Sequence, residues 1–418
     1  MHIRLLILGS LGEFVPLIRQ AKERGLYTVV CDGYPNGIGK QYADAAYTID
    51  VGDTAAMAAL CQEERITHIL TSYSDYLFES MIRIAEAAGL PAYYAKERLP
   101  YYRNKQIMKD MLLSLNIATP KFCTLSKDFS STALAGFTYP LVAKPLDKYG
   151  SRGVMVLNSL AELRANFDHI CETSQTKAVL VDEYHTGYEF NMMTWVHQGT
   201  VHVLSIADRE KSPIGAHEIP ISSRNVYPSL YAATLYEPAR SILQKVAEFT
   251  GQTEGALSMQ FFWRPGEPIS VCEVAGRFFG YEHELLSYVS ELSTDTLLLD
   301  SVSDPAALSR SLLHHSPFFT TVSAVLYFHG KPGKTVQSME ALYDVATLEG
   351  VRDSWIFYKE GETIVKHGPN PYVARFYIAG ETRAAVDALT RKIVSMASVR
   401  ATDGEEVLYP TSVTKYIL

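Results

Sequence analysis

The sequence predicts an α/β protein whose N-terminal parallel βαβ domain is followed by segments of mixed α+β structure. Two observations support this fold class. Strand and helix patterns alternate over residues 1–98, which is the rhythm of a parallel sheet with helices on both faces. Beyond residue 98, strand patterns follow one another in pairs, with helical patterns between the pairs. At 418 residues, the chain is long enough for two or three domains.

The composition is that of an ordinary globular protein, with 47% hydrophobic and 20% charged residues. A net charge of -8 argues against a dedicated nucleic-acid binder, which carries a basic surface. No uninterrupted apolar run approaches the roughly 18 residues of a membrane span, and the five cysteines include no C-x-x-C pair. We therefore expect a cytoplasmic protein with reduced thiols, no zinc site and no membrane partner.

The first element is the strand pattern IRLLIL, because its apolar stretch is too short for a signal peptide. The following GSLGEF lacks the G-x-G-x-x-G spacing of a dinucleotide site, although Asp32 stands where an acidic ribose ligand would follow a second strand. We favour a plain strand-to-helix turn. Strands are expected at residues 3–8, 27–32 and 67–72, and helices at 14–25, 54–66 and 79–90.

A second organisation begins near Tyr101 and continues to about residue 302. An amphipathic helix is expected at its start, and Thr119-Pro120 ends that helix. Helices are expected at residues 104–117, 159–174 and 237–251, and strands at 141–143, 154–157, 178–184, 188–199 and 200–210, with a strand pair over 255–277. From residue 303 to 418 the chain has an α+β pattern, which includes 321–330 and 372–397.

Lys144 lies in an otherwise apolar strand pattern. Burying an ammonium group is costly unless an anion meets it, so either the side chain reaches solvent or something negative comes to it. The polar loop 147–153 that follows contains two glycines. Such a loop can present backbone N–H groups to phosphate oxygens.

Other separated residues complete a consistent set. Lys105 lies on the expected entry helix, and the pair Glu183 and Glu189 flanks a glycine. Glu273 and Arg277 stand at and just beyond a strand end. Lysines suit phosphate as point charges, and Mg²⁺ takes one or two carboxylates together with phosphate oxygens. The set would serve a nucleoside triphosphate with magnesium.

The motifs NKQIMK, YPLVAKPLDKYGSRGV, VDEYHTGYEF and SMQFFW…ISVCEVAGRFFG occur in this order over roughly residues 100 to 285. Together they resemble the ATP-grasp superfamily, of the carboxylate–amine ligase type. The resemblance implies an ATP-grasp fold of two α+β subdomains over 99–302, with a flexible lid at about 115–186. The region 1–98 is similar to the domain that usually precedes this fold. Residues 303–418 are similar to the C-terminal segment that completes its core.

The resemblance also implies the contacts to ATP. Lys105 and Lys144 would contact the phosphates, Glu183 and Tyr184 would lie in the hinge that reads adenine, and Glu189 would hold the ribose. The loop that closes over the phosphates would contribute Tyr149, Gly150, Ser151 and Gly153.

For catalysis, the resemblance implies that Glu273 binds Mg²⁺ or Mn²⁺ and that Arg277, with Lys144, stabilises the transferring phosphate or an acyl-phosphate. Two positions depart from the common pattern. Gln260 replaces a glutamate at the nucleotide and metal site, which resembles the carbamoyl-phosphate synthetase branch. Ala275 replaces an asparagine, which resembles a carboxylase-type branch of purine biosynthesis.

The implied reaction activates a small carboxylic acid as an acyl-phosphate and couples it to an amine, with release of ADP and phosphate. An amino acid is one candidate for the acid. A bicarbonate-activating enzyme, similar to carbamoyl-phosphate synthetase or biotin carboxylase, is an alternative, and a non-catalytic nucleotide-binding regulatory protein is another. A homodimer is the assembly that the resemblance suggests.

The residues that would bind these small-molecule substrates are expected among polar groups near the motifs. Arg209 and Arg224 are candidates because the guanidinium fork matches a carboxylate. Tyr281 and His283 follow Arg277 directly and are candidates for the acceptor pocket.

Overall fold

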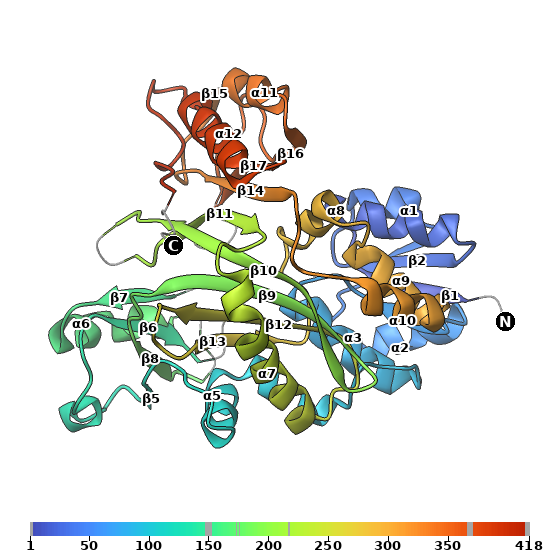
Figure 1. Ribbon diagram of the computed structural model, residues 1–418, viewed down its shortest axis with the longest axis horizontal. Coiled ribbons are helices and arrows are strands. Elements are labelled where there is room, and N and C mark those ends of the chain that lie inside the picture. Colours follow the sequence, from blue (N-terminus) through green and yellow to red (C-terminus); the bar gives the residue numbers. More distant parts are fainter. Residues whose placement is uncertain are drawn as a thin grey trace.

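The structure is a computed structural model that describes residues 3–146, 153–172, 174, 176–215, 218–365 and 371–413. Its elements form an N-terminal α/β domain, a small lid sheet, and one long central sheet to which the C-terminal segment contributes three strands (Figure 1). The predicted fold class is confirmed. The boundaries 1–98, 99–302 and 303–418 stay a prediction.

The N-terminal domain contains a four-stranded sheet in the order β3-β2-β1-β4, with all pairs parallel. Parallel neighbours require crossover connections, and the helices between the strands provide them. Helix α3 begins four residues earlier than predicted because the hydroxyl of Ser74 caps it by accepting from the N–H of Leu77 at 3.5 Å. The strands are β1 (Arg4–Leu8), β2 (Tyr27–Asp32), β3 (Ala45–Thr48) and β4 (His68–Leu70), and the helices are α1 (Val15–Glu23), α2 (Thr54–Glu63) and α3 (Asp75–Ala88).

Two short helices lead into the lid sheet. They are α4 (Pro100–Arg103) and α5 (Lys105–Ser114). The lid sheet has the order β5-β8-β6-β7, is antiparallel throughout, and contacts helix α6. Its elements are β5 (Phe122–Leu125), β6 (Leu141–Pro145), β7 (Met155–Leu157), α6 (Leu160–Cys171) and β8 (Val179–Glu183).

The central sheet has eight strands in the order β13-β12-β9-β10-β11-β14-β17-β16, and all neighbours are antiparallel. Helix α7 packs against β10 and β12, and α12 packs against β14 and β17. The strands are β9 (Tyr188–His197), β10 (Thr200–Ser212), β11 (Ile221–Tyr227), β12 (Glu254–Trp263), β13 (Ser270–Ala275), β14 (Val322–His329), β16 (Val351–Ile356) and β17 (Tyr372–Gly380).

The remaining elements surround this sheet. A separate ribbon pairs β15 (Val336–Ser338) with β18 (Arg400–Ala401). The helices are α7 (Ala232–Thr250), α8 (Leu286–Val289), α9 (Thr294–Ser303), α10 (Pro305–His314), α11 (Glu340–Ala346) and α12 (Arg383–Met396). Single 3₁₀ turns occupy Gly12–Phe14, Ile38–Tyr42, Lys96–Arg98, Ser131–Leu134 and His283–Leu285.

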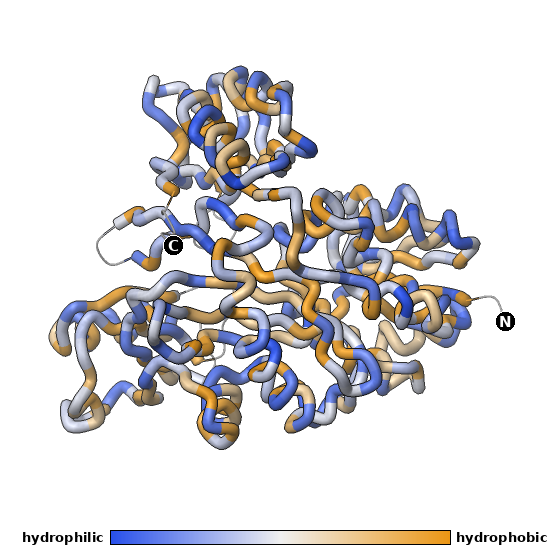
Figure 2. The backbone as a smooth tube through the Cα atoms, viewed as in Figure 1, coloured by the Kyte–Doolittle hydropathy of each residue, from blue (hydrophilic) through white to orange (hydrophobic). Residues whose placement is uncertain are grey.

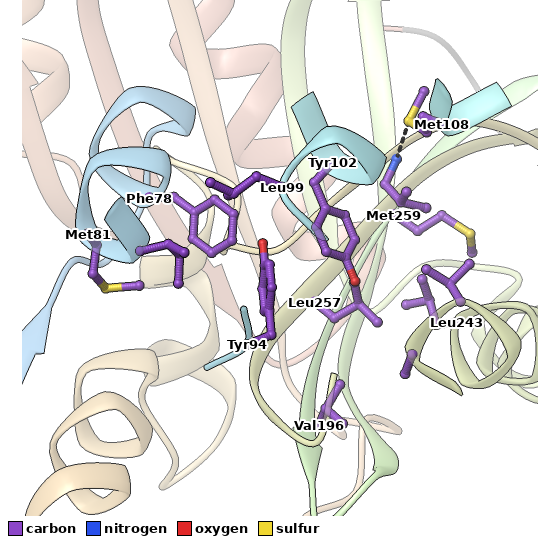
Figure 3. Packing of buried hydrophobic residues seen from close by; sticks show 14 of the residues in the cluster. Phe78, Met81, Tyr94, Leu99, Tyr102, Met108, Val196, Leu243, Leu257 and Met259 are labelled. Atoms are coloured by element: carbon purple, nitrogen blue, oxygen red, sulfur yellow. Dashed lines mark hydrogen bonds between the residues drawn. The ribbon is translucent and has the colours of Figure 1, made fainter. Parts of the chain in front are cut away.

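Hydrophobic residues run along the strands of the central sheet, while hydrophobic and hydrophilic residues alternate along the helices (Figure 2). One cluster joins the N-terminal domain to the central sheet, and Figure 3 shows Tyr94 between Phe78 of α3 and Tyr102 of α4. The hydroxyl of Tyr102 donates to the side chain of Gln252 at 2.9 Å. The polar end of this buried aromatic ring is therefore satisfied, and the two regions share one core.

Across the described ranges, none of the helices has the combination of length and apolar character that spanning a bilayer would require.

Candidate active site

One face of the central sheet gathers three of the predicted residues from three adjacent strands. Gln260 on β12 is the register partner of Glu273 on β13. The amide nitrogen of Gln260 also donates to the carboxylate of Glu189 on β9. Because side chains alternate between the faces of a strand, these contacts place all three groups on the same face.

Glu189 is held by two cations of the neighbouring strand β10. The Nε of Arg209 lies 2.7 Å from Oε1 of Glu189, and the Lys211 ammonium contacts Oε2. Arg209 thus lies beside Glu189, and its role toward a substrate stays a prediction. In this structure, Arg209 and Lys211 neutralise the charge of the Glu189 carboxylate. The predicted role of Glu189 in holding a ribose stays a prediction.

Lys144 meets its anion within the protein. Its Nζ lies 2.7 Å from Oδ2 of Asp182, while Lys109 approaches Oδ1 of the same carboxylate at 3.1 Å. Burial disfavours the Lys144 ammonium, but the charge of Asp182 outweighs it and raises the pKa of Lys144 above its ordinary value. Lys144 therefore remains charged at neutral pH.

Lys105 opens helix α5, which Asn104 caps by accepting from the N–H groups of Gln106 and Ile107. Burial, with repulsion from Lys144, lowers the pKa of the Lys105 side chain, and Glu273 opposes that shift. Lys105, Lys144 and Glu273 therefore lie within electrostatic reach of one another. An anion bound among these residues would stabilise the buried ammonium group of Lys105.

Arg277 is engaged in a bidentate ion pair with Asp75, the first residue of α3. Its Nε and Nη2 donate to the two carboxylate oxygens at 2.8 Å each, and its Nη1 donates to the carbonyl of Phe278 at 3.0 Å. Although burial opposes ionisation, the guanidinium lowers the pKa of Asp75. Arg277 thus links the end of β13 to the N-terminal domain. Its role toward a phosphate stays a prediction.

The hinge between the lid and the central sheet contains Glu183 and Tyr184. The backbone N–H of Glu183 donates to Lys121 and that of Tyr184 to Pro140, and the Glu183 carboxylate accepts from the N–H of Thr138 at 2.8 Å. The Glu183 side chain thus holds the loop at Thr138, and contact of the backbone groups of Glu183 and Tyr184 with adenine stays a prediction.

Part of the predicted phosphate loop, namely Tyr149, Gly150 and Ser151, lies outside the described residues. Gly153 is described and has a φ of +71°, where a side chain would be strained. A Cβ there would also meet Pro145 at 2.9 Å and the carbonyl of Ile170 at 3.1 Å. Glycine is therefore required where the loop re-enters β7.

The prediction for Arg224 is wrong. Its guanidinium is buried and pairs with Glu210 at 2.8 Å and with Asp387 of α12 at 2.7 Å. Glu210 neighbours Arg209 along β10, so the two side chains point to opposite faces of the sheet. Arg224 fastens α12 to the back of the sheet and does not face the site.

Tyr281 and His283 both lie beyond β13, at the carboxyl edge of the N-terminal sheet. His283 is buried, its ring lies 5.4 Å from that of Tyr73, and its Nε2 lies 3.4 Å from the hydroxyl of Ser72. Tyr281 lies over the guanidinium of Arg375 at 3.9 Å. Their roles toward a substrate stay predictions.

Several residues of the site were not predicted. The motif VDEY directs attention to Glu183, yet its neighbour Asp182 is the carboxylate that meets Lys144. Lys109 follows Lys105 by four residues, a spacing that places both on one side of a helix. Outside this site, Arg375 also lies within an apolar strand, the same signal that singles out Lys144.

The residues fit ATP and Mg²⁺. Lys105 and Lys144 supply positive charge for a polyphosphate, and Glu273 supplies a carboxylate beside the amide of Gln260. Among the residues that the structure describes, no group of three or more His, Cys, Asp and Glu side chains forms a metal cage. Mg²⁺ commonly takes one or two carboxylates together with phosphate oxygens and water, which this donor set allows.

Comparison with known proteins agrees with this geometry. Residues 137–283 match the family described as "ATP-grasp domain". The chain is 26% identical over 285 residues to the formate-dependent phosphoribosylglycinamide formyltransferase of Burkholderia vietnamiensis, a match that covers 66% of this chain and 69% of that protein.

Two solved structures share the fold. The L-amino acid ligase from Bacillus licheniformis superposes with a TM-score of 0.79 at 16% identity, over 96% of this chain and all of that one. The biotin carboxylase domain of the Hydrogenobacter thermophilus 2-oxoglutarate carboxylase, in complex with MgADP and bicarbonate, superposes with a TM-score of 0.74 at 16% identity, over 97% and 92% of the two chains. At these identities the likeness shows the fold alone. The comparisons thus show an ATP-grasp domain at residues 137–283 and, over nearly the whole chain, the fold of these two solved structures, and they agree with the predicted ATP-dependent, ADP-forming ligase that uses Mg²⁺.

Proposed function

We propose that this protein activates a small carboxylic acid as an acyl-phosphate and couples it to an amine. The observation that carries the proposal is the convergence of Lys105, Lys144 and Glu273, from three separate parts of the chain, on one region. Arg209 lies at the same face of the central sheet and is about one quarter exposed. Phosphoryl transfer from ATP to an anionic acid brings two anions together, so positive charge that neutralises both favours the reaction.

The reaction balances in two steps. A carboxylate oxygen attacks the γ-phosphorus of ATP, the bond to the β-phosphate oxygen breaks, and ADP leaves. The amine nitrogen then attacks the acyl carbon, the C–N bond forms, and phosphate leaves with the electron pair of the C–O bond while the amine loses a proton. Lys105 and Lys144 hold the phosphates in line and neutralise their charge. Glu273, with the carbonyl oxygen of Gln260, would hold Mg²⁺, which neutralises charge on the phosphates when bound.

A bicarbonate-activating reaction is the second candidate, favoured by Gln260 at the metal site. The amide contributes no negative charge there, and its nitrogen is committed to Glu189. Both reactions begin with attack of a carboxylate-type oxygen on ATP, so they differ in the acid rather than in the phosphate site.

The test is ADP and phosphate release from purified protein with ATP, Mg²⁺ and a panel of acids and amines. A ligase releases ADP in step with a matched acid–amine pair, and the amide product forms in equal amount. Release that depends on bicarbonate supports the second candidate. A protein that binds ATP but releases no ADP with any pair or with bicarbonate would be the non-catalytic alternative, and the proposal would be wrong.

A paired substitution assigns the activity to the site. Lys144→Ala should lower kcat/KM for ATP at least tenfold, because it removes a charged contact worth about 1.5–3 kcal/mol. Lys127→Ala is the matched control, since Lys127 lies on the same lid and pairs with Asp168 at 2.7 Å on the exposed surface. Equal rates for the two variants would contradict the assignment.

A further inference from the structure

Arg375 forms a second cationic centre, separate from the lysines of the phosphate region. It lies on β17, and its side chain is fully buried. Its Nη2 donates to Oε1 of Glu13, just beyond β1, at 2.6 Å. Burial disfavours the charge, but Tyr377, Glu13 and Glu284 hold the pKa of Arg375 above its ordinary value. Neither Lys105 nor Lys144 is among its strongest electrostatic neighbours.

Aromatic rings surround the guanidinium. Its carbon lies 3.9 Å from the ring centroid of Tyr281, 5.0 Å from that of Phe357 and 5.8 Å from that of Trp355. Such rings stabilise a cation and also offer apolar surface. Phe357 is 40% exposed, so one of these rings reaches the solvent.

The donors of Arg375 are only partly used. Apart from the bond to Glu13, its Nη1 lies 3.4 Å from the hydroxyl of Tyr377, and its buried Nε has no hydrogen-bond partner among the described residues. Leaving a charged buried donor unsatisfied is costly. The hydroxyl of Tyr73, whose ring lies 5.6 Å from that of Tyr281, is likewise buried with no partner in the described ranges.

Tyr281 is held over Arg375 in a strained conformation. Its φ is +65°, which is rare for a bulky residue, and its carbonyl accepts from the hydroxyl of Tyr327 at 2.9 Å. Strain of this kind persists where the surroundings impose it, commonly at ligand sites. Tyr281 follows Arg277 by four residues and contacts Arg375. It therefore connects the end of β13, near the proposed phosphate site, with the second cationic centre.

We propose, on the basis of the proposed function, that Arg375 binds the carboxylate of the acceptor, and that the acceptor is an α-amino acid with an apolar or aromatic side chain. A guanidinium matches a carboxylate through two parallel hydrogen bonds, and the rings around it would pack against the side chain. Glu13 and Glu284 already contribute negative charge around the guanidinium, so a singly charged carboxylate suits the centre better than a phosphate dianion. The acceptor's amine attacks the acyl carbon, and its carboxylate passes unchanged into the product.

A binding measurement tests this without requiring turnover. L-phenylalanine and L-phenylalaninamide, in which an uncharged amide replaces the carboxylate, are titrated calorimetrically into the wild-type protein, Arg375→Gln and Glu13→Gln. The wild type should bind phenylalanine about 10- to 100-fold more tightly than the amide, and Arg375→Gln should lose this preference. Glu13→Gln is the matched control, because it breaks the same ion pair but keeps the guanidinium, and it should retain the preference.

Each outcome decides the matter. If both folded variants lose the preference, Arg375 only joins the N-terminal domain to β17, and the inference is wrong. If the wild type binds the two compounds equally or binds neither, the inference is also wrong. In turnover, Arg375→Gln should raise KM for phenylalanine and leave KM for ATP unchanged. Absence of ADP release with every acid and amine would instead count against the proposed function, whatever the binding result.

Discussion

Replacing Asp182 by asparagine removes the carboxylate that holds two largely buried ammonium groups. The side chain of Lys109 is 1% exposed, that of Lys144 is 14% exposed, and Asp182 is 8% exposed between them, at 3.1 and 2.7 Å. Removing one partner of a buried ion pair leaves an uncompensated charge, which costs about 3–5 kcal/mol. For a chain of 418 residues that unfolds as one unit, this corresponds to a fall in Tm of roughly 3–6 °C.

The assay is thermal unfolding at pH 7, followed by circular dichroism. Asp168→Asn is the matched control, because Asp168 pairs with Lys127 at the same 2.7 Å on the same lid, but with side chains 73% and 68% exposed. Exposed pairs contribute little, so the control Tm should not change measurably. If the two substitutions lowered Tm equally, the reasoning that burial makes the Asp182 contacts strong would be refuted.

Glu273→Gln should raise the Mg²⁺ concentration needed for half-maximal ADP release at least tenfold, because Glu273 is the carboxylate proposed to hold the metal beside Gln260; an unchanged magnesium titration would rule out that role. Asp75→Asn should destabilise the protein at pH 5–7 and lose its effect as the pH falls. The pKa of Asp75 is lowered by Arg277 in the folded state, so its stabilisation is present above the unfolded pKa of about 3.9 and disappears as the pH falls through the folded value. A difference in unfolding free energy from wild type that stayed constant from pH 6 down to pH 2.5 would show that this ion pair does not contribute as described.

The N-terminal domain and the order of the motifs could be predicted because local patterns determine them. The alternation of strands and helices predicts a parallel sheet, and a lysine within an apolar strand needs either an anion or a path to solvent wherever the strand lies. Some boundaries could not be found in this way. Helix α7 begins at Ala232, although Pro238 suggested a start at Glu237. Proline removes a single donor, and a well-buried helix can continue through it.

The site was only partly predictable, because neighbouring residues of a strand point to opposite faces of the sheet. The sequence does not tell which of the two faces carries the site. Arg209 and Arg224 are equivalent in the sequence as candidates for a carboxylate, and only the register shows that Arg224 faces α12. The partner of Lys144 likewise depended on which of two adjacent acidic residues points inward. The cytoplasmic location and the homodimer stay predictions.

The continuous central sheet has a consequence for any attempt to dissect this protein. The region that matches the ATP-grasp domain ends at residue 283, yet β11 within it pairs with β14, and β8 pairs with β5, both of which lie outside the matched range. An excised fragment of residues 137–283 would therefore present two rows of open backbone donors and acceptors, each four residue pairs long, and such edges readily pair with other chains. The smallest piece that could behave as a well-defined protein must keep the strands contributed from both sides of the match.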